Sequence, residues 1–294
     1  MKNMKRSLKN TRMYLLFAGP STFIFFTVII IPFIYGIYLT TTNWDGINET
    51  KEFVGFSNYL YVLNDPKFWD SFSVTIYYVF FSVLIINVIA FTLAYFLTSG
   101  ILFQKFFRAG FFVPNLIGGI TLGYVWKFIF STALPTMAKK YGISFLSVSL
   151  LGNEDGAVWA MVFATVWQYA GYMMVIYIAG FMMVPKELLE ASSIDGANSF
   201  QKLKSVTLPL MTSSFVICTF LSLQRAFMVY DVNLALTDGG PYGTTRMLSM
   251  HVYNEAFTAS RYGSGQAEAF FLFLMVATVA LVQVYFSQKL EVEA

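Results

Sequence analysis

The chain has 294 residues, of which 57% are hydrophobic and 12% charged, and its formal net charge is +3. Soluble domains carry about 25% charged residues, so this chain has too few charges to cover a globular surface, and lipid is its expected solvent. The small net charge gives no support for nucleic-acid binding. With one cysteine, Cys218, and one histidine, His251, a disulfide framework is excluded and a Cys/His metal cluster is disfavoured.

The N-terminal tail, residues 1–13, is basic and precedes a long apolar run. This order resembles a signal peptide at first sight. However, the run from Met13 to Asn43 carries no charge and is far longer than the apolar region of a signal peptide. We therefore predict an uncleaved first span. The basic residues of the tail are Lys2, Lys5, Arg6, Lys9 and Arg12.

Six apolar segments are long enough to cross a hydrocarbon core, which needs about 20 residues in a helix. Their apolar runs are continuous rather than alternating, which favours helices over the strands of a barrel. We predict an all-α, multi-pass membrane protein in which residues 14–294 form a single transmembrane domain. The expected spans are 14–39, 71–98, 108–131, 157–183, 206–229 and 268–287.

The distribution of Lys and Arg predicts the orientation, because cytoplasmic loops carry an excess of these residues. With an even number of spans, both termini share one side, and that side holds the basic tail. The first loop on the other side, 40–70, is acidic. Both termini are therefore expected in the cytoplasm of a cell membrane protein, together with the loop 185–205. The further basic residues on this side are Lys105, Arg108, Lys186, Lys202, Lys204 and Lys289.

A polar interruption, residues 185–209, separates the fourth and fifth spans. Pro185 can begin a new helix, and Glu187 and Glu190 then lie where a helix N-terminus favours negative charge. Gly196 can end this helix, because glycine readily adopts the left-handed conformation. A second short helix is expected before the fifth span. An ordinary amphipathic connector at the membrane surface is the alternative interpretation.

The spacing of Glu190-Ala191-Ser192, Gly196 and Val206-x-Leu208-Pro209 resembles the EAA loop of ABC importer permeases. Ser192 stands in place of the second alanine and Val206 in place of isoleucine. The resemblance implies that this loop docks on a cytoplasmic ATPase. The residues that it assigns to coupling are Glu187, Glu190, Ala191, Ser192, Asp195, Gly196, Ala197, Phe200, Leu208 and Pro209.

The resemblance covers almost the whole chain. Asn43-Trp44-Asp45-Gly46, Leu236-Thr237-Asp238-Gly239-Gly240-Pro241 and Tyr262-Gly263 are similar to motifs of the maltose and glycerol-phosphate branch of these importers. This implies the type I importer permease fold and half of a pathway that works by alternating access. It also implies an ATPase dimer that binds ATP and Mg, a second and unlike permease, and an extracytoplasmic solute-binding protein. The sequence contains no phosphate-binding GxxxxGK[ST] motif, so we expect no cofactor in this chain and no enzymatic activity.

The polar residues within the fourth and fifth spans are candidates for solute contact, because polar groups inside a membrane are costly. Resemblance to maltose-type permeases places Thr165, Tyr169, Tyr172 and Ser222 at a midmembrane sugar site, and packing between helices is an equal alternative. Arg225 could reach the membrane interface or meet an acidic or phosphorylated solute. The full set of candidates is Thr165, Gln168, Tyr169, Tyr172, Ser222, Gln224 and Arg225.

Two other classes of protein remain as alternatives. An ion- or proton-coupled secondary transporter or channel would predict inverted repeats or functional charges in several spans, and the sequence shows no repeat. A membrane enzyme would predict a charged or His-rich cluster at one membrane face, which is not visible. Within the importer interpretation, a non-sugar solute such as glycerol phosphate stays open.

Overall fold

The computed structural model describes residue 13 and residues 16–144 and 147–288, so the basic residues of the tail and Lys289 lie outside it. The described residues form helices and loops, and they contain no strand beyond an isolated bridge between Thr42 and Phe53. The predicted all-α fold is therefore confirmed. The chain divides into two compact units, Met1–Asp65 with Val252–Phe271, and Pro66–His251 with Leu272–Ala294.

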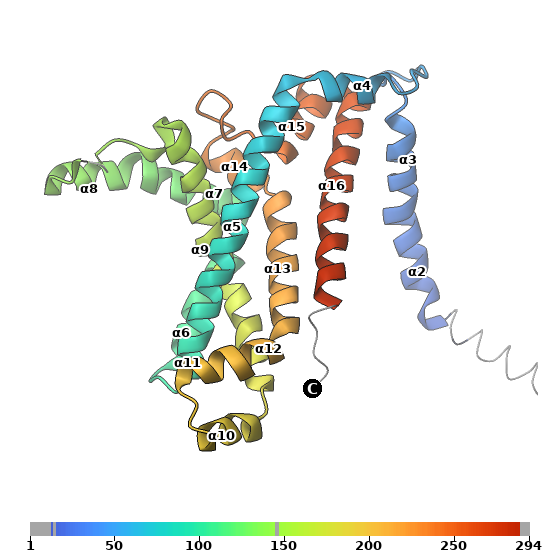
Figure 1. Cartoon of the computed structure of the whole chain (residues 1–294). Coiled ribbons are helices and arrows are strands. Elements are labelled where there is room, and N and C mark those ends of the chain that lie inside the picture. The colour runs from blue at the N-terminus through green and yellow to red at the C-terminus, as the bar shows by residue number, and fades with distance from the viewer. Residues whose placement is uncertain (1–12, 14–15, 145–146, 289–294) are drawn as a thin grey trace, which may run out of the picture. The chain divides into compact units, whose positions relative to one another are not determined.

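The helices follow one another along the chain as Figure 1 shows. In order, they are α2 (Gly19–Phe25), η1 (Phe26–Ile30), α3 (Ile31–Leu39), α4 (Ser57–Asn64), α5 (Pro66–Thr98), α6 (Gln104–Phe112), η2 (Val113–Leu116), α7 (Gly119–Phe128), η3 (Ile129–Ala133), α8 (Leu134–Tyr141), η5 (Leu150–Gly152), α9 (Glu154–Met183), α10 (Lys186–Ile194), α11 (Ser199–Lys202), η6 (Leu203–Thr207), α12 (Leu208–Leu210), α13 (Thr212–Phe227), α14 (Asp231–Leu236), α15 (Leu248–Tyr253), η7 (Asn254–Thr258) and α16 (Tyr262–Gln288).

Among the described residues, four helical stretches are long and apolar enough to span a membrane, and their bounds are Gly19–Leu39, Pro66–Thr98, Glu154–Met183 and Tyr262–Phe286. The other two expected spans are not straight helices. Gln104–Leu116 and Gly119–Tyr141 meet at an angle of 100°, and Ser199–Leu210 and Thr212–Phe227 meet at 70°. The six expected spans are therefore matched if each bent pair crosses the membrane once.

Prolines explain an irregularity in three of the helical stretches. The π-helical segments η1, η3 and η6 each end two residues before a proline, and these prolines are Pro32, Pro135 and Pro209. A proline inside a helix lacks an N–H, and its ring collides with the carbonyl four residues earlier. A π-helical turn changes which carbonyl lies opposite the ring, and the helix continues past the proline.

In the first unit, the loop after α3 is fastened to the start of α16. The side-chain amide of Asn58 donates to the carbonyls of Thr40 and Thr42, at 2.8 and 2.7 Å. The Gly263 N–H donates to the Trp44 carbonyl at 3.0 Å, and a Cβ on Gly263 would collide with the Thr42 carbonyl. These contacts join the motif around Trp44 to the motif around Gly263.

Hydrogen bonds in the same loop also lower the pKa of the Asp45 carboxyl. The largest effect comes from the backbone N–H of Asn48, followed by that of Ile47. Asp45 Oδ1 accepts from both N–H groups at 2.9 Å. These donors favour the charged carboxylate, so the turn is expected to weaken only when pH falls through this lowered pKa.

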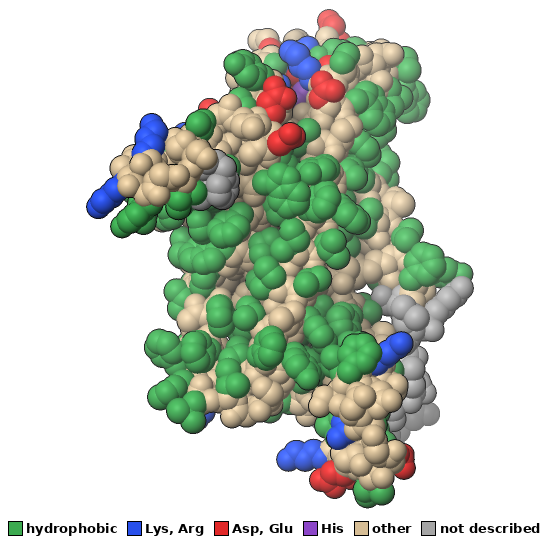
Figure 2. Space-filling view, turned by 60° about the vertical axis from the view of Figure 1, so that its left-hand side comes forward, with side chains coloured by type: hydrophobic (Ala, Val, Ile, Leu, Met, Phe, Trp, Pro, Cys, Tyr) green, Lys and Arg blue, Asp and Glu red, His purple; other side chains and the backbone are tan. Residues whose placement is uncertain are grey.

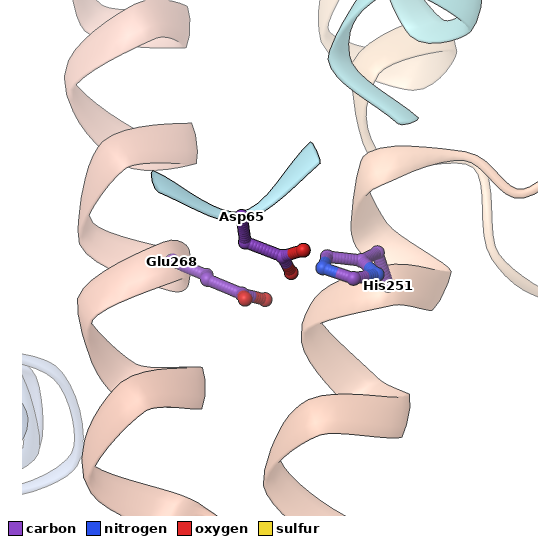
Figure 3. Close-up of side chains that lie close together, drawn as sticks. All are labelled: Asp65, His251 and Glu268. Atoms are coloured by element: carbon purple, nitrogen blue, oxygen red, sulfur yellow. The ribbon is translucent and has the colours of Figure 1, made fainter. Parts of the chain in front are cut away.

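Two carboxylates of the first unit lie close together. Figure 3 shows Asp65, which follows α4, and Glu268 on α16 with their carboxylates near each other. Their carboxylate oxygens lie within 4.8 Å, and Glu268 is fully buried. The third side chain drawn in the figure, His251, belongs to the other unit.

The core of the second unit is built around α5 and α9, which run side by side (Figure 1). Small residues such as Ala90, Ala94 and Ala164 are fully buried along them, which allows close approach of the helices. Gly171 on α9 has no room for a Cβ, because the Phe111 carbonyl at the end of α6 lies against it. Figure 2 shows that hydrophobic side chains cover much of the visible surface, as expected for a surface in contact with lipid or other apolar helices.

Two glycines allow a second close contact, between α7 and α14. A Cβ on Gly119 would lie 2.7 Å from the Asp231 Cβ, and one on Gly123 would lie 2.6 Å from the Ala235 Cβ. The pair has the small-xxx-small spacing that lets helix backbones approach. The LTDGGP loop after α14 is held in turn by Asn233, whose side-chain amide donates to the Thr245 carbonyl at 2.8 Å.

Candidate functional site

The loop between α9 and α13 contains the first candidate site, and its helices begin and end where the sequence indicates. Pro185 precedes α10, and Glu187 lies in the first turn. Gly196 follows the helix with a φ of +78°, and the space around its missing Cβ is open within 4 Å. Gly196 is therefore required for its backbone conformation and not for close packing.

The second short helix, α11, begins with a capping box formed by Asn198 and Gln201. The backbone N–H of Gln201 donates to the Asn198 side chain at 2.9 Å, and the Asn198 N–H donates to the Gln201 side chain at 2.8 Å. The Asn-x-x-Gln spacing is readable from the sequence as a capping box. Lys202 Nζ then donates to Ser193 Oγ at 2.6 Å, which joins α11 to α10.

The loop presents apolar side chains on an otherwise polar surface. Ile194 is 88% exposed and Phe200 is 70% exposed, and Leu188 is exposed as well. Figure 1 shows α10 at the end of the second unit opposite α14. The other assigned residues divide into exposed ones (Glu187, Glu190, Ala191, Asp195, Gly196 and Pro209) and half-buried ones (Ser192, Ala197 and Leu208).

Three of the candidate solute residues lie inside the packed helices. Thr165 shares a hydrogen bond of 2.7 Å with the Tyr78 hydroxyl. The Gln168 amide donates to the Ile117 carbonyl at 2.9 Å. Ser222 is fully buried and accepts from the side-chain amide of Asn87 at 3.0 Å. In this conformation these side chains join helices of the second unit to one another.

The other four candidates are more accessible to solvent, and three of them, Tyr169, Tyr172 and Arg225, form an open face of α9 and α13. Tyr169 and Tyr172, three residues apart on α9, are half-buried, and Gln224 and Arg225 on α13 are exposed. The guanidinium carbon of Arg225 lies 4.7 Å from the centre of the Tyr169 ring and 5.4 Å from that of Tyr172. Both distances are in the range of a cation–π contact.

Asn87 on α5 is a structural centre that the sequence analysis missed. Its side chain accepts from the Tyr177 hydroxyl at 2.8 Å and donates to Ser222, so it connects α5, α9 and α13. An amide within an apolar span is a recognisable signal, because it needs partners where water is absent.

Comparison with known proteins shows the family to which this chain belongs. The profile of the family described as "Binding-protein-dependent transport system inner membrane component" matches residues 3–292. The chain is 40% identical, over 293 residues and the full length of both proteins, to the probable starch degradation products transport system permease protein AmyD of Thermoanaerobacterium thermosulfurigenes. It is 34% identical to the multiple sugar-binding transport system permease protein MsmF of Streptococcus mutans serotype c, over 89% of this chain and 90% of that protein.

The fold is similar to that of a solved structure. A chain of a bacterial ABC transporter involved in the import of the acidic polysaccharide alginate superposes with a TM-score of 0.82 at 18% sequence identity. The match covers 97% of this chain and 99% of that one. The predicted type I importer permease fold is therefore confirmed.

Proposed function

Because the chain belongs to the family of inner-membrane components of binding-protein-dependent transport systems, we propose that it forms one permease half of an ATP-driven importer of saccharides. The observation that carries the proposal is the loop 185–209, which has the EAA-like spacing and a preformed pair of helices with exposed apolar side chains. The protein would lie in the cell membrane with its termini and this loop in the cytoplasm, as the Lys and Arg distribution favours.

The loop is the docking element for a cytoplasmic ATPase. Ile194 and Phe200 supply apolar surface that a groove of the ATPase would cover, and Glu187 and Glu190 supply charge at its edge. ATP and Mg are bound by the ATPase dimer, which would move α10 and α11 during its cycle. Since this loop connects α9 to α13, its displacement acts on both helices of the open face.

The open face of α9 and α13 forms part of the translocation pathway. Tyr169, Tyr172, Gln224 and Arg225 would face a second, unlike permease across this pathway. Thr165, Gln168 and Ser222 are buried within the helices that form this face, and their hydrogen bonds hold these helices in place. An extracytoplasmic binding protein would deliver the solute, and alternating access follows from movement of the two halves.

The names of the relatives support a saccharide as the transported solute. AmyD and MsmF are named for starch degradation products and for multiple sugars, and the alginate transporter imports a polysaccharide.

Co-purification tests the proposal. The chain, expressed with the genes of its own importer, is expected to co-elute with an ATPase whose activity the loaded binding protein stimulates. Ile194→Asp should abolish co-elution, because it places a charge in the docking surface. Ile47→Asp is the matched control, since Ile47 is 80% exposed on the loop after α3. Full co-elution and stimulated activity in Ile194→Asp would contradict the proposed role of the loop.

A further inference from the structure

Arg225 has no hydrogen bond or ion pair with the described residues of the chain, and its guanidinium lies over the rings of Tyr169 and Tyr172. The hydroxyls of the two tyrosines likewise have no hydrogen-bond partner among the described residues. A guanidinium has five N–H donors, which are costly to leave unfilled away from bulk water. The side chain is therefore held in position while its donors remain available.

Arg225 lies near the C-terminal end of α13, in a bent helix pair that is a candidate membrane span. Thr212–Phe227 is a helix of 16 residues. At about 1.5 Å per residue, Arg225 lies about 20 Å from the start of the helix, whereas the hydrocarbon core is about 30 Å thick. A charge at this depth faces a bundle interior or a water-filled cavity and not lipid.

The contact geometry separates the role of the tyrosines from that of the arginine. The guanidinium lies over the ring faces, which a sugar would otherwise need for stacking. A planar guanidinium resting on a ring keeps its edge free, and its paired N–H groups match two adjacent oxygens. The tyrosines are thus positioning residues, and the arginine is the group that can reach a solute.

We propose that Arg225 is the solute-contacting residue of this face, that it binds two adjacent oxygens of the solute through its guanidinium edge, and that Tyr169 and Tyr172 act by holding it in place. This inference rests on the proposed function. Adjacent oxygens occur both in the vicinal hydroxyls of a neutral saccharide and in the carboxylate of a uronate.

The test uses the complete importer in lipid nanodiscs, with its binding protein and its ATPase trapped by vanadate. The probes are two radiolabelled oligosaccharides of equal length, neutral maltotetraose and the α-1,4-linked tetramer of galacturonate, and the readout is the affinity of the trapped complex for each probe. Arg225→Gln should weaken binding about 5- to 150-fold, because the solute loses a buried hydrogen-bond partner. A loss of affinity for maltotetraose would identify vicinal hydroxyls as the group that Arg225 binds. A loss of affinity for the galacturonate tetramer would identify the carboxylate.

Further variants test whether paired N–H donors, and not charge alone, bind the solute. They also test whether the tyrosine rings contact the solute directly. Arg225→Lys should also bind weakly, because an ammonium is a point charge without paired donors. Tyr169→Phe and Tyr172→Phe should bind normally, because they keep the rings. Tyr169→Leu and Tyr172→Leu should bind weakly in the native background and should add nothing to Arg225→Gln. Tyr124→Leu is the matched control, since Tyr124 is 61% exposed on α7.

Specific outcomes overturn the inference. Unchanged affinity in Arg225→Gln would show that Arg225 does not contact the solute. Full binding by Arg225→Lys would show that paired N–H donors are not required. A full additional loss from Tyr172→Leu in the Arg225→Gln background would show that the tyrosine contacts the solute itself. Failure of both probes to bind the native complex, with the ATPase and binding protein assembled, overturns the proposed saccharide function and this inference with it.

Discussion

At the scale of single residues, Asn87 illustrates how a polar group stabilises an apolar unit. It bonds to Tyr177 on α9 and to Ser222 on α13. Replacement of Asn87 by Leu keeps the volume but leaves both hydroxyls without this partner. We expect a loss of stability of about 1–3 kcal/mol, or nearer 0.6 kcal/mol if the hydroxyls find other partners in the membrane.

Thermal unfolding of the purified chain in detergent measures the effect of Asn87→Leu. The control is Thr92→Val on the same helix, because the Thr92 hydroxyl donates only within its own helix, to the Val88 carbonyl at 2.7 Å. An equal loss of melting temperature in both variants would show that the connection between helices contributes nothing.

Gly123 tests close packing at the same scale. A Cβ there would meet the Ala235 Cβ at 2.6 Å, so Gly123→Ala should force α14 away from α7 and cost about 1–3 kcal/mol. Gly110→Ala is the control, because the space around Gly110 is open within 4 Å, and a helix-favouring alanine should be neutral or stabilising there. Protease sensitivity of the loop after α14, together with melting temperature, reports the change. An unchanged melting temperature and normal protease protection in Gly123→Ala would show that the close contact between α7 and α14 contributes nothing to stability.

At the scale of elements, Gly196 was predicted from the sequence to end a helix, and its backbone conformation shapes the loop 185–209. Its φ of +78° is strained for a β-branched side chain, so Gly196→Val should destabilise the end of α10 by about 1–2 kcal/mol or more and lower association with the ATPase. Gly196→Asn should retain association, because asparagine tolerates this conformation. Pull-down of the ATPase from membranes compares the two variants. Equal association of Val and Asn variants would show that the turn is not required.

The sequence predicted the helix ends at Pro185 and Gly196 well, because both depend on local backbone chemistry. It predicted the bends poorly. The expected span 108–131 contains Pro114 and the pair Gly118-Gly119, which are signals of a break, yet average hydropathy over a window does not register them. The structure breaks there by 100°.

The roles of the polar candidates could not be separated by sequence for a related reason. Thr165, Gln168 and Ser222 lie within a few residues of Tyr169 and Arg225 along the same helices, but helix rotation and neighbouring helices decide which side chains are covered. Thr165 and Ser222 are buried, whereas Arg225 is exposed. A polar residue in a span is therefore predictable as important, but its partner is not.

At the scale of the whole molecule, the orientation in the membrane stays a prediction from Lys and Arg. In a Cys218→Ala background, single cysteines at Asn48 and Tyr242 should react with an impermeant maleimide from outside intact cells. Both positions are exposed, Tyr242 by 94%. A cysteine at Ile194 should react only after the membrane is opened. The reverse pattern would invert the predicted topology.

The described helices leave much apolar surface uncovered, which fits a chain that works within an assembly. Within the second unit, the window of Pro66–Thr98 is only 28% buried, whereas that of Glu154–Met183 is 67% buried. Lipid or the proposed second permease would cover the remainder. The sequence could indicate this through its composition, but it could not indicate which helices would be left uncovered.

The hydrogen bonds inside the loop 185–209 affect how a movement of this loop would reach α13. The capping box of α11 and the bond from Lys202 to Ser193 are present in the isolated chain, so the loop is already ordered before any partner arrives. An ATPase that docks here, as proposed, would lose little free energy in ordering the loop, and more of the interaction energy could act on the helices to which the loop is attached. In the proposed importer, a movement of α10 would be transmitted to α13 through this hydrogen-bonded segment, and disrupting its bonds should uncouple ATP hydrolysis from transport even where the two proteins still bind.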